Sequence, residues 1–267
     1  METPLSRMGI IIVIIVVATA ALSPLAPFDP NAINLEDQLA PMSSRHILGT
    51  DFHGRDVFSR LVHGARTTLI AATITVVFAA VIGCSIGLTA GYLRGIVDSV
   101  IMRTMDIILS FPAIVLAIAL TAALGASLQN AMISITVVTL PAFARVARGQ
   151  TLVLREMDYV QAARATGVGD TSIVLHHILP NCLGPIVVQM TLYVAVSILT
   201  TAGLGFLGLG AQPPTPEWGA DLAEGMRYMR AAPWVATFPG LAVFIAALGF
   251  NLLGDGLADI MNPKLRE

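Results

Sequence analysis

The sequence predicts an all-α polytopic membrane protein with six transmembrane helices. Of its 267 residues, 55% are hydrophobic and only 12% are charged, and the mean hydropathy is +0.79. Soluble domains carry about 25% charged residues. The apolar runs approach the ~20 residues that a helix needs to cross a bilayer, whereas a transmembrane β-strand needs about 10. The six runs cover residues 8–24, 67–92, 99–124, 128–147, 183–204 and 235–254.

These runs divide the chain into three parts. Residues 1–66 contain the first transmembrane helix and a long extracytoplasmic loop, residues 67–256 contain the other five helices, and residues 257–267 form a cytoplasmic tail. Cytoplasmic loops of membrane proteins are enriched in arginine and lysine. With both termini inside, nine of these basic residues lie in the cytoplasm and six lie outside, so we expect an N-in/C-in orientation.

The first run also imitates a cleaved secretory signal peptide. It follows Arg7 and contains Ala18-Thr19-Ala20, which are typical of such peptides. Its apolar character nevertheless continues as far as Phe28. We therefore expect a helix that stays in the membrane, with cleavage as the alternative.

The ionisable residues exclude several classes of function. A net charge of −2 and a pI near 6.2 give no basis for nucleic-acid binding. The single lysine is Lys264, and the sequence contains no GxxxxGK[ST] phosphate-binding loop. If the protein takes part in ATP-driven transport, another chain must hydrolyse the ATP. Cys84 and Cys182 are expected to be reduced thiols.

The sequence predicts no catalytic residue, cofactor or metal site. Residues 83–87 match the GxSxG nucleophile elbow, but that elbow needs a strand–turn–helix context and this match lies inside an apolar helix. The middles of the transmembrane runs are nearly free of charge, whereas a proton-coupled carrier usually needs a buried titratable relay. The histidines lack the spacing of zinc sites, and they stand at positions 46, 53, 63, 176 and 177.

Small residues recur every four positions in the second run. Gly83, Gly87 and Gly91 form this series, and Ala79 and Gly95 extend it. Such ridges let helix backbones approach closely in a membrane. We expect them to pack helices together, with direct pore lining as the alternative.

Proline and glycine mark the irregular parts of the chain. Pro112 and Pro141 predict kinks in the third and fourth spans. Residues 205–233 are too rich in glycine and proline for a regular helix, and Trp218 within them suits a membrane interface. Residues 57–62 of the outer loop have helical apolar spacing, which predicts an interfacial helix leading into the second span.

A polar insert at residues 159–181 separates two long apolar runs. Its first part, 158–165, consists of good helix formers, and Gly167 can supply the turn that ends this helix. A second helix is expected at 171–179 and is closed by Pro180. A membrane protein that only spans the bilayer needs no such insert, so we interpret it as a cytoplasmic handle for a soluble partner. An ordinary surface loop is the alternative.

The insert resembles the signature of binding-protein-dependent ABC importer permeases, in which EAA, three residues, glycine and nine residues precede I-x-L-P. Here Gln161-Ala162-Ala163, Gly167 and His177-Ile178-Leu179-Pro180 have that spacing, and Gln161 and His177 replace Glu and Ile. Four further segments resemble the C-type permease of the dipeptide/oligopeptide/nickel branch. They are residues 48–66, 105–112, 206–219 and 250–266.

This resemblance implies a subunit of a transporter in the bacterial inner membrane, and not an enzyme. Its expected partners are a paralogous permease, two cytoplasmic ATPase subunits and an extracytoplasmic solute-binding protein, together with membrane lipid. Short peptides are the expected solute, with nickel or a nickel chelate as the alternative and glycosides as a weaker one. From other classes, a self-sufficient channel and an intramembrane enzyme stay open. The resemblance makes 155–180 the coupling loop, and its expected contact residues are Gln161, Ala162, Ala163, Arg164, Gly167, His177, Leu179 and Pro180.

Overall fold

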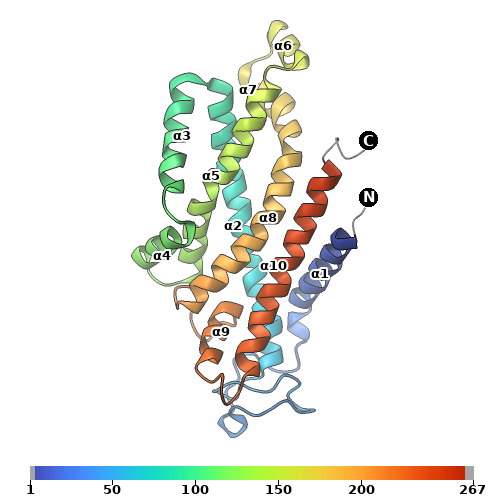
Figure 1. Cartoon of the computed structure of the whole chain (residues 1–267), viewed down its shortest axis with the longest axis vertical. Coiled ribbons are helices and arrows are strands. Elements are labelled where there is room, and N and C mark those ends of the chain that lie inside the picture. Colours follow the sequence, from blue (N-terminus) through green and yellow to red (C-terminus); the bar gives the residue numbers. More distant parts are fainter. Residues whose placement is uncertain (1–3, 262–267) are drawn as a thin grey trace.

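The computed structural model describes residues 4–261, and every regular element in that range is helical (Figure 1). The end of the expected tail, residues 262–267 with Lys264, lies outside the described residues. Two short 3-10 turns, Ser23–Leu25 and Leu35–Asp37, lie in the long loop after the first helix. The α-helices are α1 (Pro4–Ala21), α2 (Val57–Leu93), α3 (Gly95–Leu109), α4 (Ala113–Leu124), α5 (Leu128–Leu154), α6 (Asp158–Ala165), α7 (Asp170–Ser172), α8 (Leu179–Phe206), α9 (Trp218–Met226) and α10 (Trp234–Met261).

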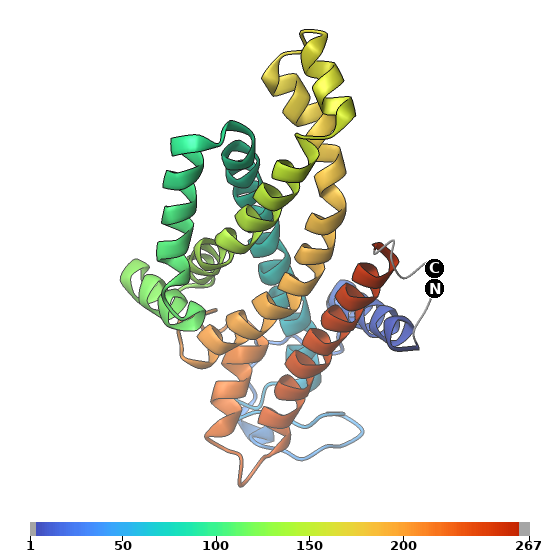
Figure 2. The same ribbon diagram turned by 45° about the horizontal axis from the view of Figure 1, so that its top comes forward.

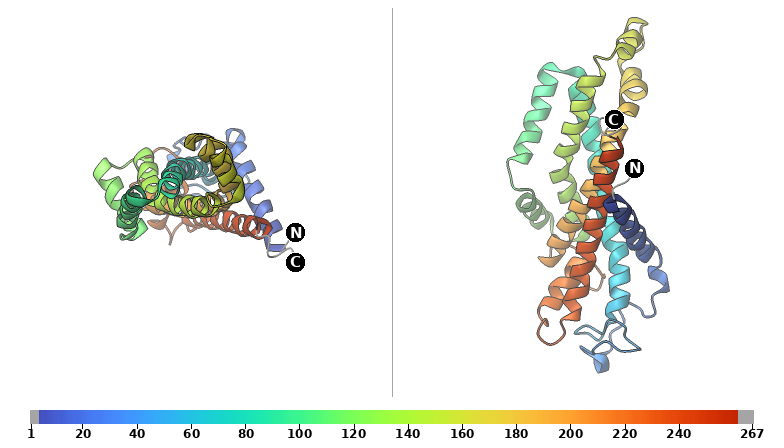
Figure 3. Two further views of the ribbon diagram at one scale, coloured as in Figure 1. Left: turned by 90° about the horizontal axis from the view of Figure 1, so that it is seen from above. Right: turned by 45° about the vertical axis from the view of Figure 1, so that its right-hand side comes forward.

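The helices form an elongated bundle. In the end-on view of Figure 3, α3 and α4 lie at one end of the cross-section and α1 and α10 lie at the other. Small residues bring α1 and α10 together, since a Cβ on Gly249 would lie 2.5 Å from Ile12 Cγ2 and one on Gly256 would lie 2.3 Å from Ser6 Oγ. The polar segment with α6 and α7 projects from one end of the bundle, and α9 and the 25–56 loop lie at the opposite end (Figure 1).

Within residues 4–261, five helical segments are long and apolar enough to cross a membrane. They are α1, α2, α5, the run Asp170–Phe206 and α10. The predicted third span, 99–124, is not one helix, because α3 and α4 meet at an angle of 90° (Figure 2). Pro112 stands at the start of α4 and has no N–H to continue the hydrogen bonds of α3. The described residues therefore contain six spans only if this bent pair counts as one.

Helix α2 is longer than the sequence predicted. The expected interfacial helix at 57–62 is its first part, and the Asp56 carboxylate caps its start by accepting a hydrogen bond from Ser59 N. At 1.5 Å per residue its 37 residues reach about 55 Å, well beyond the ~30 Å core of a bilayer. One helix thus extends from the long loop after α1 to the opposite end of the bundle.

The glycine series of α2 faces α5. A Cβ on Gly83, Gly87 or Gly91 would lie 2.2 to 2.8 Å from atoms of α5, and for Gly87 the nearest atom is the carbonyl oxygen of Ala144. Real Cβ atoms do not approach other atoms so closely, so any side chain here would force the two helices apart. Pro141 lies within the facing part of α5.

Residues 205–233 are more regular than their composition predicts. Helix α9 begins at Trp218, whose indole N–H donates to the carbonyl of Leu61 on α2 at 2.9 Å. Only 3% of Trp218 is exposed, so the expected position at a membrane interface is wrong. Gly64 makes room for this indole, since a Cβ there would lie 2.8 Å from Trp218 Cδ1. The tryptophan joins α9 to α2.

A buried carboxylate completes this junction. Glu217 caps α9 and accepts hydrogen bonds from Gly219 N and Ala220 N, both at 2.9 Å, and from Thr68 Oγ1 of α2 at 3.2 Å. The residue is fully buried. Burial raises the pKa of Glu217 from 4.5 to about 7, although the hydrogen bonds oppose this shift.

The raised pKa predicts that acid stabilises the fold. Because folded Glu217 holds its proton more tightly than the unfolded chain does, its contribution favours folding at low pH and is lost as the pH rises from 4.5 through about 7. This contribution is at most about 3 kcal/mol. Glu217→Gln should therefore reduce the fall in thermal stability between pH 5 and pH 8, whereas the exposed control Glu36→Gln should not. Identical pH profiles of wild type and Glu217→Gln would contradict the raised pKa.

Candidate coupling segment

The polar insert forms two helical arms joined at a glycine turn. Helix α6 ends near Thr166, and Gly167 follows with φ +82°, a conformation that residues with a side chain rarely adopt. Val168 N donates back to Ala163 O at 3.1 Å, and Gly167 N donates to Arg164 O at 3.0 Å, so the last carbonyls of α6 have partners. The expected helix, turn and second helix are present.

The second arm does not stop at Pro180. It passes from α7 through a π-helical stretch, Ile173–Ile178, into α8, and Pro180 lies in the first turn of α8. Proline is tolerated in a first turn, and the wider π turn adjusts the hydrogen bonds around it. The expected closure of this helix is therefore wrong, and Asp170–Phe206 forms one run of 37 residues from the polar segment into the bundle.

The two arms pack on each other, and their apolar side chains belong to a core that continues into the bundle. Val160 of the first arm and Ile173 and Ile178 of the second arm are all 0% exposed. Because these β-branched side chains are fully enclosed, the segment forms a compact body. A compact segment can be displaced as a unit.

The residues expected to contact a partner lie on both sides of the turn. Gln161, Ala162, Arg164, Gly167 and Pro180 are exposed, and Ala163, His177 and Leu179 are half-buried.

Two of these polar side chains, Gln161 and Arg164, already form hydrogen bonds within the protein. Gln161 Nε2 donates to the carbonyl of Arg155 at 2.8 Å, which a glutamate carboxylate could not do. Arg164 Nη2 donates to the hydroxyl of Tyr92 on α2 at 3.2 Å. Sequence reasoning did not find Tyr92, because the contact joins residues 72 positions apart.

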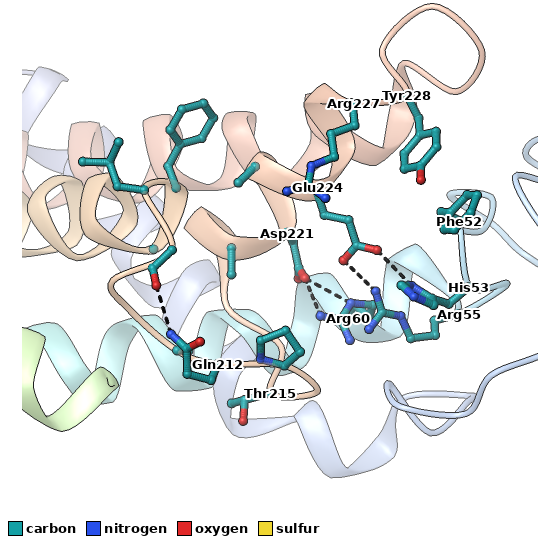
Figure 4. A pocket seen from close by; sticks show the side chains of 18 residues that line it. Phe52, His53, Arg55, Arg60, Gln212, Thr215, Asp221, Glu224, Arg227 and Tyr228 are labelled. Atoms are coloured by element: carbon teal, nitrogen blue, oxygen red, sulfur yellow. Dashed lines mark hydrogen bonds and ion pairs between the residues drawn. The ribbon is translucent and has the colours of Figure 1, made fainter. Parts of the chain in front are cut away.

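A cavity of about 490 Å³ lies at the opposite end of the molecule, between α9 and the loop that precedes α2 (Figure 4). Arg60 binds Asp221, and Arg55 bridges Asp51 and Glu224 with distances of 2.6 and 2.8 Å. Burial raises the pKa of Asp221, against the effect of the neighbouring Arg60. These pairs tie the loop to α9.

Three side chains beside this cavity have the geometry of metal ligands. Asp51, His53 and Glu224 offer ligand atoms that lie within 4.8 Å of one another, although the sequence spacing of the histidines gave no sign of it. Arg55 already donates to both carboxylates, and a cation would have to displace this guanidinium. His46 pairs with Asp56 at 2.9 Å, and His63 contacts the carbonyl of Ser59.

The catalytic-looking motif is part of a helix. Ser85 of residues 83–87 lies within α2 and donates to the carbonyl of Val81 at 2.7 Å, so it does not have the geometry of a nucleophile elbow. Cys84 and Cys182 are buried free thiols. Neither the serine nor the two cysteines have the surroundings of a catalytic nucleophile.

Comparison with known proteins identifies the family. The family described as binding-protein-dependent transport system inner membrane component matches residues 83–267. The chain is 46% identical to the probable D,D-dipeptide transport system permease protein of Escherichia coli K12, over 98% of this chain and 88% of that protein. It is 44% identical to the dipeptide transport system permease protein of Alkalihalophilus pseudofirmus, over 100% of this chain and 88% of that protein. It is also 44% identical to the glutathione transport system permease protein of Pectobacterium atrosepticum, over 97% of this chain and 86% of that protein.

A solved structure supports the fold. A chain of the MetNI methionine ABC transporter in an inward-facing conformation superposes with a TM-score of 0.57 at 24% identity, over 76% of this chain and 96% of that chain. The chain thus shares the fold of that transporter chain. The chain belongs to the family of binding-protein-dependent transport system inner membrane components, and it is a permease subunit of an ABC importer in the bacterial inner membrane, working with ATPase and solute-binding partners.

Proposed function

We propose that this subunit forms, together with a paralogous permease, the path by which di- or oligopeptides enter the cell. The observation that carries this proposal is the similarity to peptide-transport permeases over nearly the whole chain. Two ATPase subunits supply the energy, and a solute-binding protein delivers the peptide. Residues 67–256 act as the translocation domain, with 155–180 as its coupling loop.

Residues 155–180 transmit the work of the ATPases. The exposed face with Gln161, Ala162 and Pro180 docks in a groove of the ATPase, where alanine permits close approach. The arms share a core and the second arm continues directly into α8, so movement of the ATPases displaces the segment as a rigid body. His177 and Leu179 are half-buried, so only their exposed atoms contact the ATPase.

The proposed orientation places both termini and the coupling segment in the cytoplasm. The arginine distribution supports it, because the α6 end carries Arg94, Arg145, Arg148, Arg155 and Arg164. In a background without Cys84 and Cys182, an impermeant thiol reagent should label Glu36→Cys in intact cells and Gly169→Cys only after permeabilisation. Labelling of position 169 in intact cells would refute both the orientation and the coupling role.

Gly167→Val should uncouple transport from ATP hydrolysis. Valine has no atom to clash with here, since nothing lies within 4 Å of the site, but it strains a backbone with φ +82° and redirects the arms. The complex should assemble, while peptide uptake in proteoliposomes falls about tenfold or more. Gly169→Val is the matched control, because Gly169 has equal space and a φ of −66°. Full uptake by Gly167→Val would show that the turn has no coupling role.

Deletion of the gene tests the solute. A strain auxotrophic for an amino acid should lose growth on di- or oligopeptides that contain it, and the cloned gene should restore growth. Nickel-dependent urease activity in the same strain provides the second measurement. If peptide uptake is intact while urease activity collapses, the peptide assignment is wrong and the importer assignment stands.

A further inference from the structure

Tyr92 joins both arms of the coupling segment to α2. Its hydroxyl donates to Asp170 Oδ1 of the second arm at 2.5 Å and accepts from Arg164 Nη2 of the first arm at 3.2 Å. The Arg164 guanidinium carbon also lies 5.6 Å from the centre of the Tyr92 ring. One hydroxyl therefore holds an anionic and a cationic side chain from either side of the Gly167 turn.

A second set of contacts fixes the end of α2 that carries this tyrosine. Arg155, just after α5, donates from Nη1 to the carbonyls of Tyr92 at 2.5 Å and Gly91 at 3.3 Å, and its guanidinium carbon lies 5.7 Å from the Tyr92 ring. The last carbonyls of a helix have no partner within the helix, so a cation there stabilises the terminus. Tyr92 as a whole is only 7% exposed, and its ring cannot swing away without breaking these contacts.

From these contacts we propose that Tyr92 is the positioning residue through which displacement of the coupling segment moves α2. The inference rests on the proposed function of that segment and names its mechanical attachment. The ring of Tyr92 belongs to the same apolar core as Val160 and Ile178, whereas its hydroxyl makes the polar contacts with the two arms. What the hydroxyl adds is a link between the segment and another helix.

Helix α2 can carry the displacement to the far end of the molecule. It is continuous over 37 residues, and its first part is bound to α9 by three contacts: Arg60 with Asp221, Trp218 with Leu61 O, and Thr68 with Glu217. A rigid helix held at both ends transmits a shift of one end to the other. The structure thus connects the coupling segment with the outer cavity through a single helix.

The test uses the complete transporter in proteoliposomes with its binding protein. Tyr92→Phe keeps the ring and removes the hydroxyl, and with it both charge-assisted hydrogen bonds, to Asp170 and from Arg164. The amount of peptide transported per ATP hydrolysed should fall about tenfold or more. Co-purification of the subunits should persist. The control is Tyr193→Phe, because Tyr193 packs on Phe143 at 5.3 Å and its hydroxyl makes no hydrogen bond with the described residues.

Asp170 provides a second, exposed position for the same test. Asp170→Ala should reproduce the loss of coupling. Asp170→Asn keeps an acceptor for the tyrosine hydroxyl and should therefore retain most of the wild-type coupling. This pair decides the question if Tyr92→Phe fails to assemble. Wild-type coupling in Tyr92→Phe, or equal coupling in the two Asp170 variants, would overturn the inference and leave the importer intact. ATP hydrolysis without peptide accumulation by the wild type would instead refute the proposed function.

Discussion

The close approach of α2 and α5 is the contact on which the rest of the structure depends. In lipid no hydrophobic gain holds two apolar helices together, so their association relies on packing of backbone against backbone. Gly83, Gly87 and Gly91 permit this approach, since even a methyl group would lie within 3 Å of α5. With its middle fixed, α2 can support α9 at one end and the coupling segment at the other. Ser85 and Cys84 lie in the same turns of α2. The Ser85 hydroxyl donates to a carbonyl of its own helix, and Cys84 is a buried free thiol.

Outside the apolar part of α2, the contacts change from packing to hydrogen bonds and ion pairs. Buried charges are costly unless paired. Arg55, just before α2, lies between Asp51 and Glu224, and Arg60, in the first turns of α2, lies against Asp221. Helix α9 and the loop that precedes α2 are thereby tied to the helix that the glycines hold in place.

Length and composition predicted five of the six apolar runs as single helices, while the run at 99–124 is bent by 90°. The turn at Gly167 followed from the conformational freedom of glycine. The errors arose where tertiary contacts override local preference. Trp218 is of a residue type common at membrane interfaces, but Gly64 on α2 leaves room for its indole inside the protein. Pro180 breaks no helix, because a π-helical stretch precedes it. Pairs such as Arg60 with Asp221 join residues 161 positions apart, so one sequence gives no sign of them.

The coupling segment differs from an ordinary loop in having fully buried apolar side chains as well as polar attachments. The core of Val160, Ile173 and Ile178 makes the segment one body, while Tyr92 and Arg155 attach that body to the end of α2. The second arm has no hinge before α8 either, because its helix is continuous. Any force on the segment therefore reaches α2 and α8 together. Since α9 contacts both helices at the end far from this segment, a shift of α2 and α8 would also move the walls of the cavity beside α9.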